Sequence, residues 1–187
     1  MTFHQHIGVN DLNDISRFDL YTQLAADKVV LHIGCADWPF VPEHNLHLHL
    51  AKVCDVLYGV DTHHEGLECL INHGIDGTML DTRIHVGKVD VVIVPEVIEH
   101  VTNVEQFLDD IAAVDADTYV FTAPCAMQCA MRGHFSRVKH TVLEIVHEDH
   151  KCWYSPYTLA NALKNHFDVK NIFWNNNISV GAICSKK

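Results

Sequence analysis

The chain has 187 residues, 48% of them hydrophobic, and a formal charge of −11 at pH 7 with histidine counted as neutral. This length suits one domain with a continuous core, so we expect a single domain over residues 1–187. No run approaches the roughly 20 apolar residues of a membrane-spanning helix, and the acidic balance argues against a large phosphate-binding surface. We therefore expect a soluble protein that has no membrane span and does not bind nucleic acid.

The cysteines and the first residues bear on the compartment. Residues 1–20 mix charged and apolar side chains and lack the basic start and apolar stretch of a secretion signal. The seven cysteines are odd in number and irregularly spaced, which favours reduced thiols. Cys125 and Cys129 have no second pair with which to complete four zinc ligands. Together these features predict a cytoplasmic protein.

Short β-rich runs alternate with helical patterns along the chain, which predicts a parallel sheet covered by helices. The first half contains a predicted helix at 11–26, a strand at 29–33, a helix at 44–53, a strand at 56–60, a helix at 63–73 and a weak strand at 77–80. Leu46, Leu50 and Val53, for example, recur at helical spacing.

The second half continues this alternation. The apolar run at 89–94 is interrupted only by Asp90, as is typical of a central strand buried on both faces. After it come a predicted helix at 104–114, a strand at 118–122, a helix at 156–167 and strands at 169–174 and 178–184, the last two forming a hairpin around an Asn-rich turn. Residues 123–151 show no clean periodicity, and we expect them to cover a ligand as a lid.

The residues that follow the predicted strands are the candidate ligand contacts, because ligands bind beyond the C-terminal ends of the strands in an open parallel sheet. Gly34 follows the first strand, where glycine either lets the backbone approach a ligand or simply makes a turn. Asp61 follows the second strand and suits either the hydroxyls of a ribose or the cap of the next helix. Asp81 follows the third strand.

Five segments stand at these strand ends in a fixed order. They are Val-Leu-His-Ile-Gly-Cys at 30–35, Gly-Val-Asp at 59–61, Leu-Asp at 80–81, the run from Val89 that includes Glu-Val-Ile-Glu-His at 96–100, and Phe-Thr-Ala-Pro at 121–124. Over nearly the whole chain they resemble the successive motifs of class I S-adenosylmethionine (SAM)-dependent methyltransferases. The segment at 96–100 is the most specific and looks like the branch that contains ubiquinone-pathway O-methyltransferases and small bacterial methyltransferases.

The resemblance implies a fold and a cofactor. The fold is Rossmann-like α/β, with a seven-stranded, mostly parallel sheet, helices on both faces and a C-terminal antiparallel hairpin. The cofactor is SAM. The loop residues His32, Gly34, Cys35 and Ala36 are implied to hold its methionine end, Asp61 its ribose and Asp81 its adenine.

The first loop departs from the family pattern Asp-x-Gly-x-Gly-x-Gly. His32 takes the place of the acid, and Ala36 and Trp38 take the places of two glycines. Asp37 is a candidate replacement for the missing acid. Because of this altered loop, a catalytically silent binding or scaffolding protein with the same fold is the alternative function.

Glu96, Glu99 and His100 share one face if their segment is helical, because they are spaced i, i+3 and i+4. With His150, they resemble the metal-binding pattern of small-RNA 3′-end methyltransferases, which implies a divalent ion such as Mg²⁺, Mn²⁺, Fe²⁺ or Zn²⁺. Two other interpretations remain open: His100 acts as a general base without a metal, with Glu96 beside it as the second candidate catalytic residue, or the two acids only stabilise a helix N-terminus.

The expected reaction is methyl transfer from SAM to a small-molecule acceptor. Oxygen acceptors need help in losing a proton, which either a cation or His100 would give. We therefore expect O-methylation of a hydroxylated small molecule or a sugar.

Overall fold

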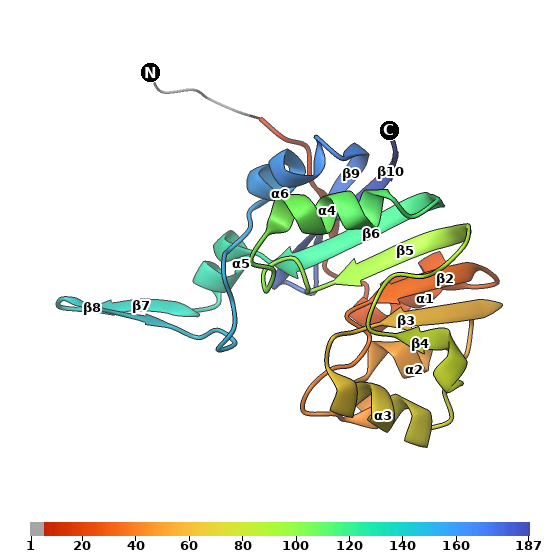
Figure 1. Ribbon diagram of the computed structural model, residues 1–187. Helices are drawn as coiled ribbons and strands as arrows, with labels where there is room; N and C mark the ends of the chain where they lie inside the picture. The colour runs from red at the N-terminus through yellow and green to blue at the C-terminus, as the bar shows by residue number, and fades with distance from the viewer. Residues whose placement is uncertain (1–5) are drawn as a thin grey trace.

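The computed structural model describes residues 6–187. One eight-stranded sheet runs through the body of the molecule (Figure 1). Its strands are β1 (Asn10–Leu12), β2 (Val29–Ile33), β3 (Val56–Val60), β4 (Leu80–Asp81), β5 (Val89–Pro95), β6 (Ala116–Pro124), β9 (Phe167–Asn175) and β10 (Ser179–Lys186). They lie in the order β1-β9-β10-β6-β5-β2-β3-β4.

The sheet is parallel except around its last strand. Strands β2 to β6 run parallel to one another, whereas β10 is antiparallel to both β6 and β9. The chain builds outward from β2 to β4 and then crosses back to place β5 on the other side of β2. The strand order therefore reverses between β2 and β5, where open α/β sheets bind ligands at the C-terminal ends of the strands.

Helices cover both faces of this sheet (Figure 1). They are α1 (Arg17–Ala25), α2 (Leu46–Leu50), α3 (His64–Asn72), α4 (Val104–Ala112), α5 (Ala126–Met131) and α6 (Pro156–Leu163), with short 3₁₀ turns at Pro42–His44 and Gly77–Met79. Leu20 of α1 and Leu50 of α2 pack with Val30 of β2. The next residue, Leu31, points to the other face, where it joins the cluster that contains Leu108 of α4. Each central strand is thus buried on both faces.

The predicted fold class is confirmed, with an eighth strand that the sequence pattern did not predict. The helix expected at 11–26 begins only at Arg17, because the Ser16 side chain caps it by accepting from the Asp19 amide. Residues Asn10–Leu12 instead pair with β9 as the parallel edge strand β1. Among the described residues, no helix has the length and hydropathy needed to cross a membrane.

The terminal hairpin forms as predicted. β9 and β10 pair antiparallel across a turn that contains Asn176 and Asn177, with φ of 57° and 54°. Asparagine tolerates this left-handed conformation, which twists the two strands in the sense that a tight hairpin needs.

Residues 123–151 do not form the lid that we expected. They contain α5 and then a separate two-stranded sheet, β7 (Phe135–Val138) and β8 (Thr141–Glu144), which projects from the body (Figure 1). Of this segment only Asp149 lines the main cleft, so the expected lid does not close over it.

Candidate active site

A cleft of about 860 Å³ opens at the C-terminal edge of the sheet. Gly34 after β2 and Asp61 after β3 line one part of it, and His100 and Asp149 line another. The connection from β4 to β5, at 82–88, contains no helix. The cleft therefore extends beneath this loop along the sheet face beside α4.

Gly34 lines the cleft and lies in close contact with the Val97 side chain. Its φ is +75°, and a Cβ atom there would lie 2.3 Å from Val97 Cγ2. Glycine is thus required both by the backbone conformation and by the side chain packed against it. The predicted approach of a ligand to Gly34 stays a prediction, and in this structure the Val97 side chain lies beside it.

The Asp61 carboxylate holds the backbone of two segments. Its Oδ2 accepts from the Ala36 amide at 2.8 Å, and its Oδ1 accepts from the His63 amide at 2.9 Å. His63 is the N-cap of α3, so Asp61 ties the loop after β2 to the start of that helix. Asp61 also lines the cleft, where its remaining lone pairs face the space predicted for a ribose.

Asp81 stands beside the cleft without lining it. Its Oδ1 accepts from the amides of Thr82 and Arg83 at 2.6 and 3.1 Å, which shapes the following loop. The side chains that reach the cleft come from this loop and include Thr82, Arg83 and His85. The predicted contact of Asp81 with adenine stays a prediction.

The other three residues predicted to contact the cofactor, His32, Cys35 and Ala36, are buried outside the cleft. Cys35 and Ala36 pack against Leu67 and Leu70 of α3. Side-chain alternation along β2 places His32 on the same face as Val30, toward α2. The family resemblance did not take this direction into account.

His32 forms a buried pair with His47 of α2. Their Nδ1 atoms lie 3.2 Å apart, and neither side chain is more than 1% exposed. Burial lowers the pKa of His47 to about 4 and holds the pKa of His32 well below its ordinary value. Both rings are therefore neutral at pH 7, with one Nδ1 donating to the other.

This pair predicts loss of stability in acid. The unfolded chain binds a proton at His47 near pH 6.5, but the folded chain does so only near pH 4. Stability present above pH 6.5 should therefore fall by about 3 kcal/mol as the pH drops to 4. Urea unfolding at several pH values should show a shallower fall for His47→Gln than for the wild type. Equal slopes for the two proteins would contradict this role of the pair.

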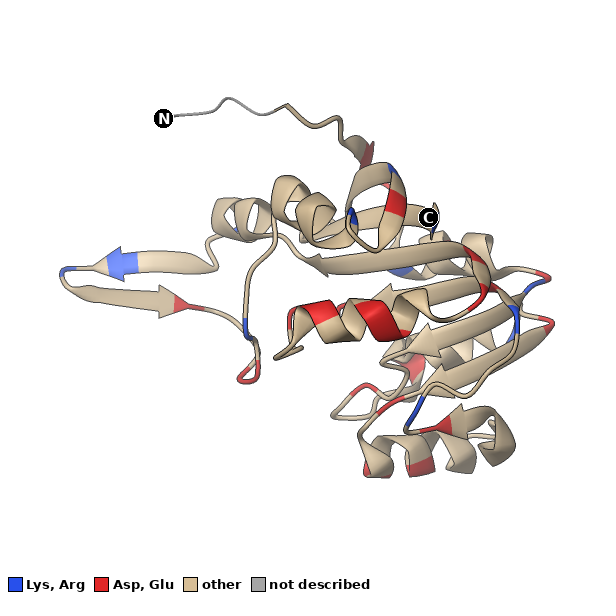
Figure 2. Cartoon of the chain, turned by 45° about the horizontal axis from the view of Figure 1, so that its top comes forward, with Lys and Arg blue, Asp and Glu red and all other residues tan. Residues whose placement is uncertain are grey.

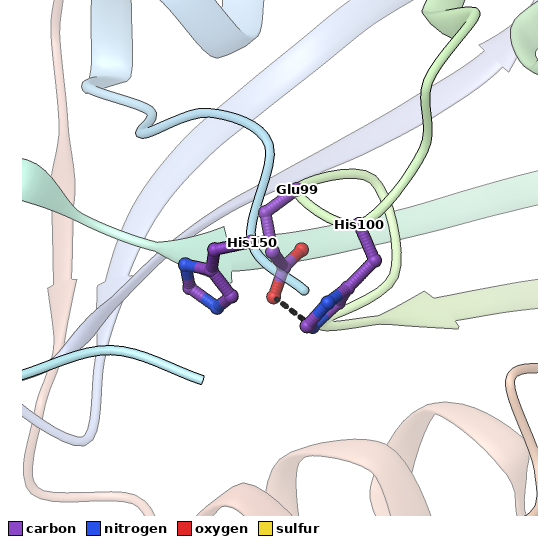
Figure 3. A group of neighbouring side chains, drawn as sticks. All are labelled: Glu99, His100 and His150. Carbon is purple, nitrogen blue, oxygen red and sulfur yellow. Dashed lines mark ion pairs between the residues drawn. The ribbon is translucent and has the colours of Figure 1, made fainter. Parts of the chain in front are cut away.

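The segment at 96–100 is a turn, so the assumption that it is helical was wrong. Glu96 has φ +53° and starts a tight reversal directly after β5. This turn separates Glu96 from the other residues predicted to bind metal. Ligand atoms of Glu99, His100 and His150 lie within 4.8 Å of one another, and Glu96 is not part of this group (Figure 3).

Glu99 is the most confined acid of the site. Its side chain is 1% exposed, and neither carboxylate oxygen has a hydrogen-bond partner among residues 6–187. Burial, helped by the nearby Glu96 charge, raises the pKa of Glu99 to about 9. The group therefore either carries a proton at pH 7 or requires a cation beside it.

His100 lies between two acids. Its Nδ1 is 2.6 Å from Asp149 Oδ1, although the two groups are not aligned as a hydrogen bond, and its Nε2 is 3.7 Å from Glu99 Oε1. His147 Nδ1 lies 2.5 Å from the same Asp149 oxygen. His100, His147 and Asp149 thus form a second group of possible ligands.

Two residues of the site were missed by the sequence analysis. Asp149 is next to the predicted His150, and only the fold shows that it faces His100. Arg17 begins α1, and its guanidinium lies near enough to Asp37, Glu96 and Glu99 to oppose the rise that burial causes in their pKa values. Arg17 lies in the second turn of the helix predicted at 11–26, and its position there gave no signal of this role.

Comparison with known proteins supports the fold. No protein-family model matches the chain, and no curated protein matches its sequence significantly. A SAM-dependent methyltransferase from Aquifex aeolicus superposes with a TM-score of 0.62 at 13% identity, over 90% of this chain and 87% of that one.

Two further solved structures contain S-adenosylhomocysteine (SAH). The N-methyltransferase NodS of Bradyrhizobium japonicum, in complex with SAH, has a TM-score of 0.56 at 15% identity, over 92% of this chain and 89% of that one. The N-terminal domain of EvdMO1, studied in the presence of SAH and D-fucose, has a TM-score of 0.56 at 17% identity, over 91% and 82%. The chain therefore has the fold of the SAM-dependent methyltransferases.

Proposed function

We propose that this protein transfers the methyl group of SAM to a hydroxyl oxygen of a small polar acceptor such as a sugar. One observation carries the proposal. The same cleft contains Gly34 and Asp61, which stand where this fold places a cofactor, and the pair His100 and Asp149, which can take a proton. Its volume is in the range of small-molecule sites.

The cleft suits the adenosine part of SAM. Asp61 offers acceptor oxygens to the ribose, while Ile84, Val86 and Val97 give apolar walls for the base. The reactivity itself comes from the sulfonium group of SAM, and the chain supplies orientation and a site with little water.

The methionine end of SAM is a zwitterion, and we assign it to the group around Arg17. There Arg17 would pair with the carboxylate, and Asp37 or Glu96 would accept from the ammonium group. Both acids lie within the electrostatic reach of Arg17. This mixture of charges fits an amino acid better than it fits a purely anionic ligand.

In the proposed step, His100 takes the proton of the acceptor hydroxyl. The Asp149 carboxylate lies beside Nδ1 of the ring, and Nε2 acts as the base. The acceptor oxygen forms a bond to the methyl carbon as the carbon–sulfur bond breaks, and SAH leaves. Glu99, protonated at neutral pH, can then donate a hydrogen bond beside His100.

A divalent cation also fits the group made by Glu99, His100 and His150. Carboxylate oxygens and imidazole nitrogens are ligands for such an ion. The two Glu99 oxygens and His150 Nδ1 are available, because they have no hydrogen-bond partner among the described residues. When bound, it would supply Lewis acidity toward the acceptor hydroxyl. Glu96, which we had expected as a further ligand, belongs instead with Arg17.

The choice of a hydroxylated acceptor rests on chemistry. Oxygen acceptors must lose a proton, and an imidazole paired with a carboxylate suits that task. EvdMO1 was studied with D-fucose, which adds support for a sugar, whereas NodS is named as an N-methyltransferase.

A silent binding protein is the second candidate. Val97 packs directly on Gly34, and both Asp61 oxygens already accept from backbone amides. If these contacts persist in solution, they would block the binding of SAM in the cleft.

The experiment for the proposal is an SAH-formation assay with SAM and a panel of sugars and other hydroxylated metabolites, with and without Mg²⁺ or Mn²⁺. Turnover with a hydroxylated acceptor, and product mass raised by one methyl group on oxygen, is the expected result. Turnover only with amine acceptors would replace the proposed acceptor class. Binding of SAM without turnover on any acceptor would favour the silent protein.

A further inference from the structure

The hairpin of β7 and β8, with its flanking residues to 132–146, forms an arm that projects from the body (Figure 1). It is a two-stranded sheet of its own, and every residue of β8 is exposed. A two-stranded hairpin is at best marginally stable in water unless its face packs against something. The arm packs at its base through Phe135 against Trp153, whereas β8 has no buried residue.

The exposed apolar surface of the protein concentrates here. Eleven large hydrophobic residues are exposed among residues 6–187, and seven of them belong to α5 or to the arm. They are Met127, Met131, Val138, Val142, Leu143, Ile145 and Val146. Exposed apolar residues gathered in one part of a folded protein are typical of an interaction site.

One face of the arm carries three of these seven residues, and its side chains in β7 and β8 include no Lys, Arg, Asp or Glu. Ser136 pairs with Leu143 and Val138 with Thr141, so these four side chains share a face. The Ile145 amide donates to the His134 carbonyl, which extends the ladder and brings Ile145 to the same face. Val138, Leu143 and Ile145, each more than half exposed, thus form one apolar row.

Charge changes sign along the arm (Figure 2). Lys139 lies in the turn at the tip, and Glu148 and Asp149 lie on the segment that returns to the body. Arg137 and Glu144 lie on the face opposite the apolar row, because they pair with Val142 and Phe135. Two arms that pack through their apolar rows in antiparallel orientation would place each basic tip against the acidic return segment of the other.

We propose that the arm and α5 are the interface between two copies of this chain, related by a two-fold axis. In an interface of this kind the same patch meets itself, as the apolar row and the reversed charges both allow. The chain as a whole carries −11, which repels anionic lipid surfaces and favours a partner that offers acidic residues to the basic tip.

The first test is sedimentation equilibrium of the full chain and of Leu143→Glu. We expect a dimer whose dissociation constant rises at least about a hundredfold in the variant, because a charge then enters the apolar row of both copies. Ile71→Glu is the matched control, since Ile71 is 47% exposed on α3, far from the arm in the sequence. Circular dichroism should show that both variants remain folded.

The second test exchanges charges between copies. Lys139→Glu and Glu148→Lys should each weaken the dimer about tenfold, because like charges meet twice across the axis. An equimolar mixture of the two variants should restore the wild-type affinity, since both contacts then join opposite charges. Glu148 does not line the cleft, so these changes leave the site residues in place.

Three outcomes would overturn the proposal. They are a monomer at every concentration, a dimer indifferent to Leu143→Glu, and a mixture of the charge variants that stays as weak as its components. Binding of the monomer to vesicles of phosphatidylglycerol, lost in Leu143→Glu, would assign the arm to a membrane surface instead.

Discussion

Replacing His100 by alanine is expected to lower kcat by about 10²–10⁴-fold, the usual contribution of a positioned general base. His100 lines the cleft and has the Asp149 carboxylate 2.6 Å from its Nδ1, so removing the ring takes away the proton acceptor. SAH binding should change little, because the change lies away from Asp61. The measurement is steady-state kinetics on the best acceptor found, with His64→Ala, an exposed histidine on α3, as the control.

The companion variant Asp149→Asn separates the roles. It should reduce kcat by less than His100→Ala does, because the ring remains but loses its orienting carboxylate. Plasma spectrometry of both variants shows whether bound divalent ion is lost together with activity, which would assign His100 to a metal site. A kcat that is unchanged in His100→Ala would contradict both roles.

Gly34→Ala is expected to destabilise the fold by about 2–4 kcal/mol, through overpacking together with a left-handed backbone. A Cβ there would meet Val97 Cγ2 at 2.3 Å, and the φ of +75° disfavours any side chain. Because Gly34 also lines the cleft, the loss should extend to cofactor affinity. Urea unfolding measures the first effect and SAH titration the second.

Two variants make this prediction specific. Gly87→Ala should be nearly neutral, since nothing lies within 4 Å of a Cβ at that position and its φ is not positive. Adding Val97→Ala to Gly34→Ala should recover part of the stability by removing the clash but not the backbone strain. A Gly34→Ala protein as stable as the wild type would show that the loop does not adopt this conformation in solution.

The sheet could be predicted from the sequence because its strands are local and strongly patterned. The apolar run of β5, the alternation with helical spacing and the asparagine turn before β10 each carry their own signal. The edge strand β1 carries none: it exists only through its pairing with β9, a contact between opposite ends of the chain.

The site was predictable only in part, because it depends on backbone direction at a few residues. The strand ends pointed to Gly34 and Asp61, and both residues line the cleft. The family spacing could not show that Glu96 takes a positive φ and lies outside the group of Glu99, His100 and His150, or that His32 packs against His47. Arg17 and Asp149 come from segments that are distant in sequence from residues 96–100, so a local motif around those residues could not identify them.

The central claim is that the cleft after β2 and β3 binds SAM, and calorimetric titration with SAH of the protein freed of bound cofactor tests it most directly. The wild type should bind in the micromolar range. Asp61→Ala should lose most of that affinity, whereas Asp55→Ala, an exposed acid at the opposite end of β3, should keep it. Absence of binding by the wild type, or equal binding by both variants, would contradict the account.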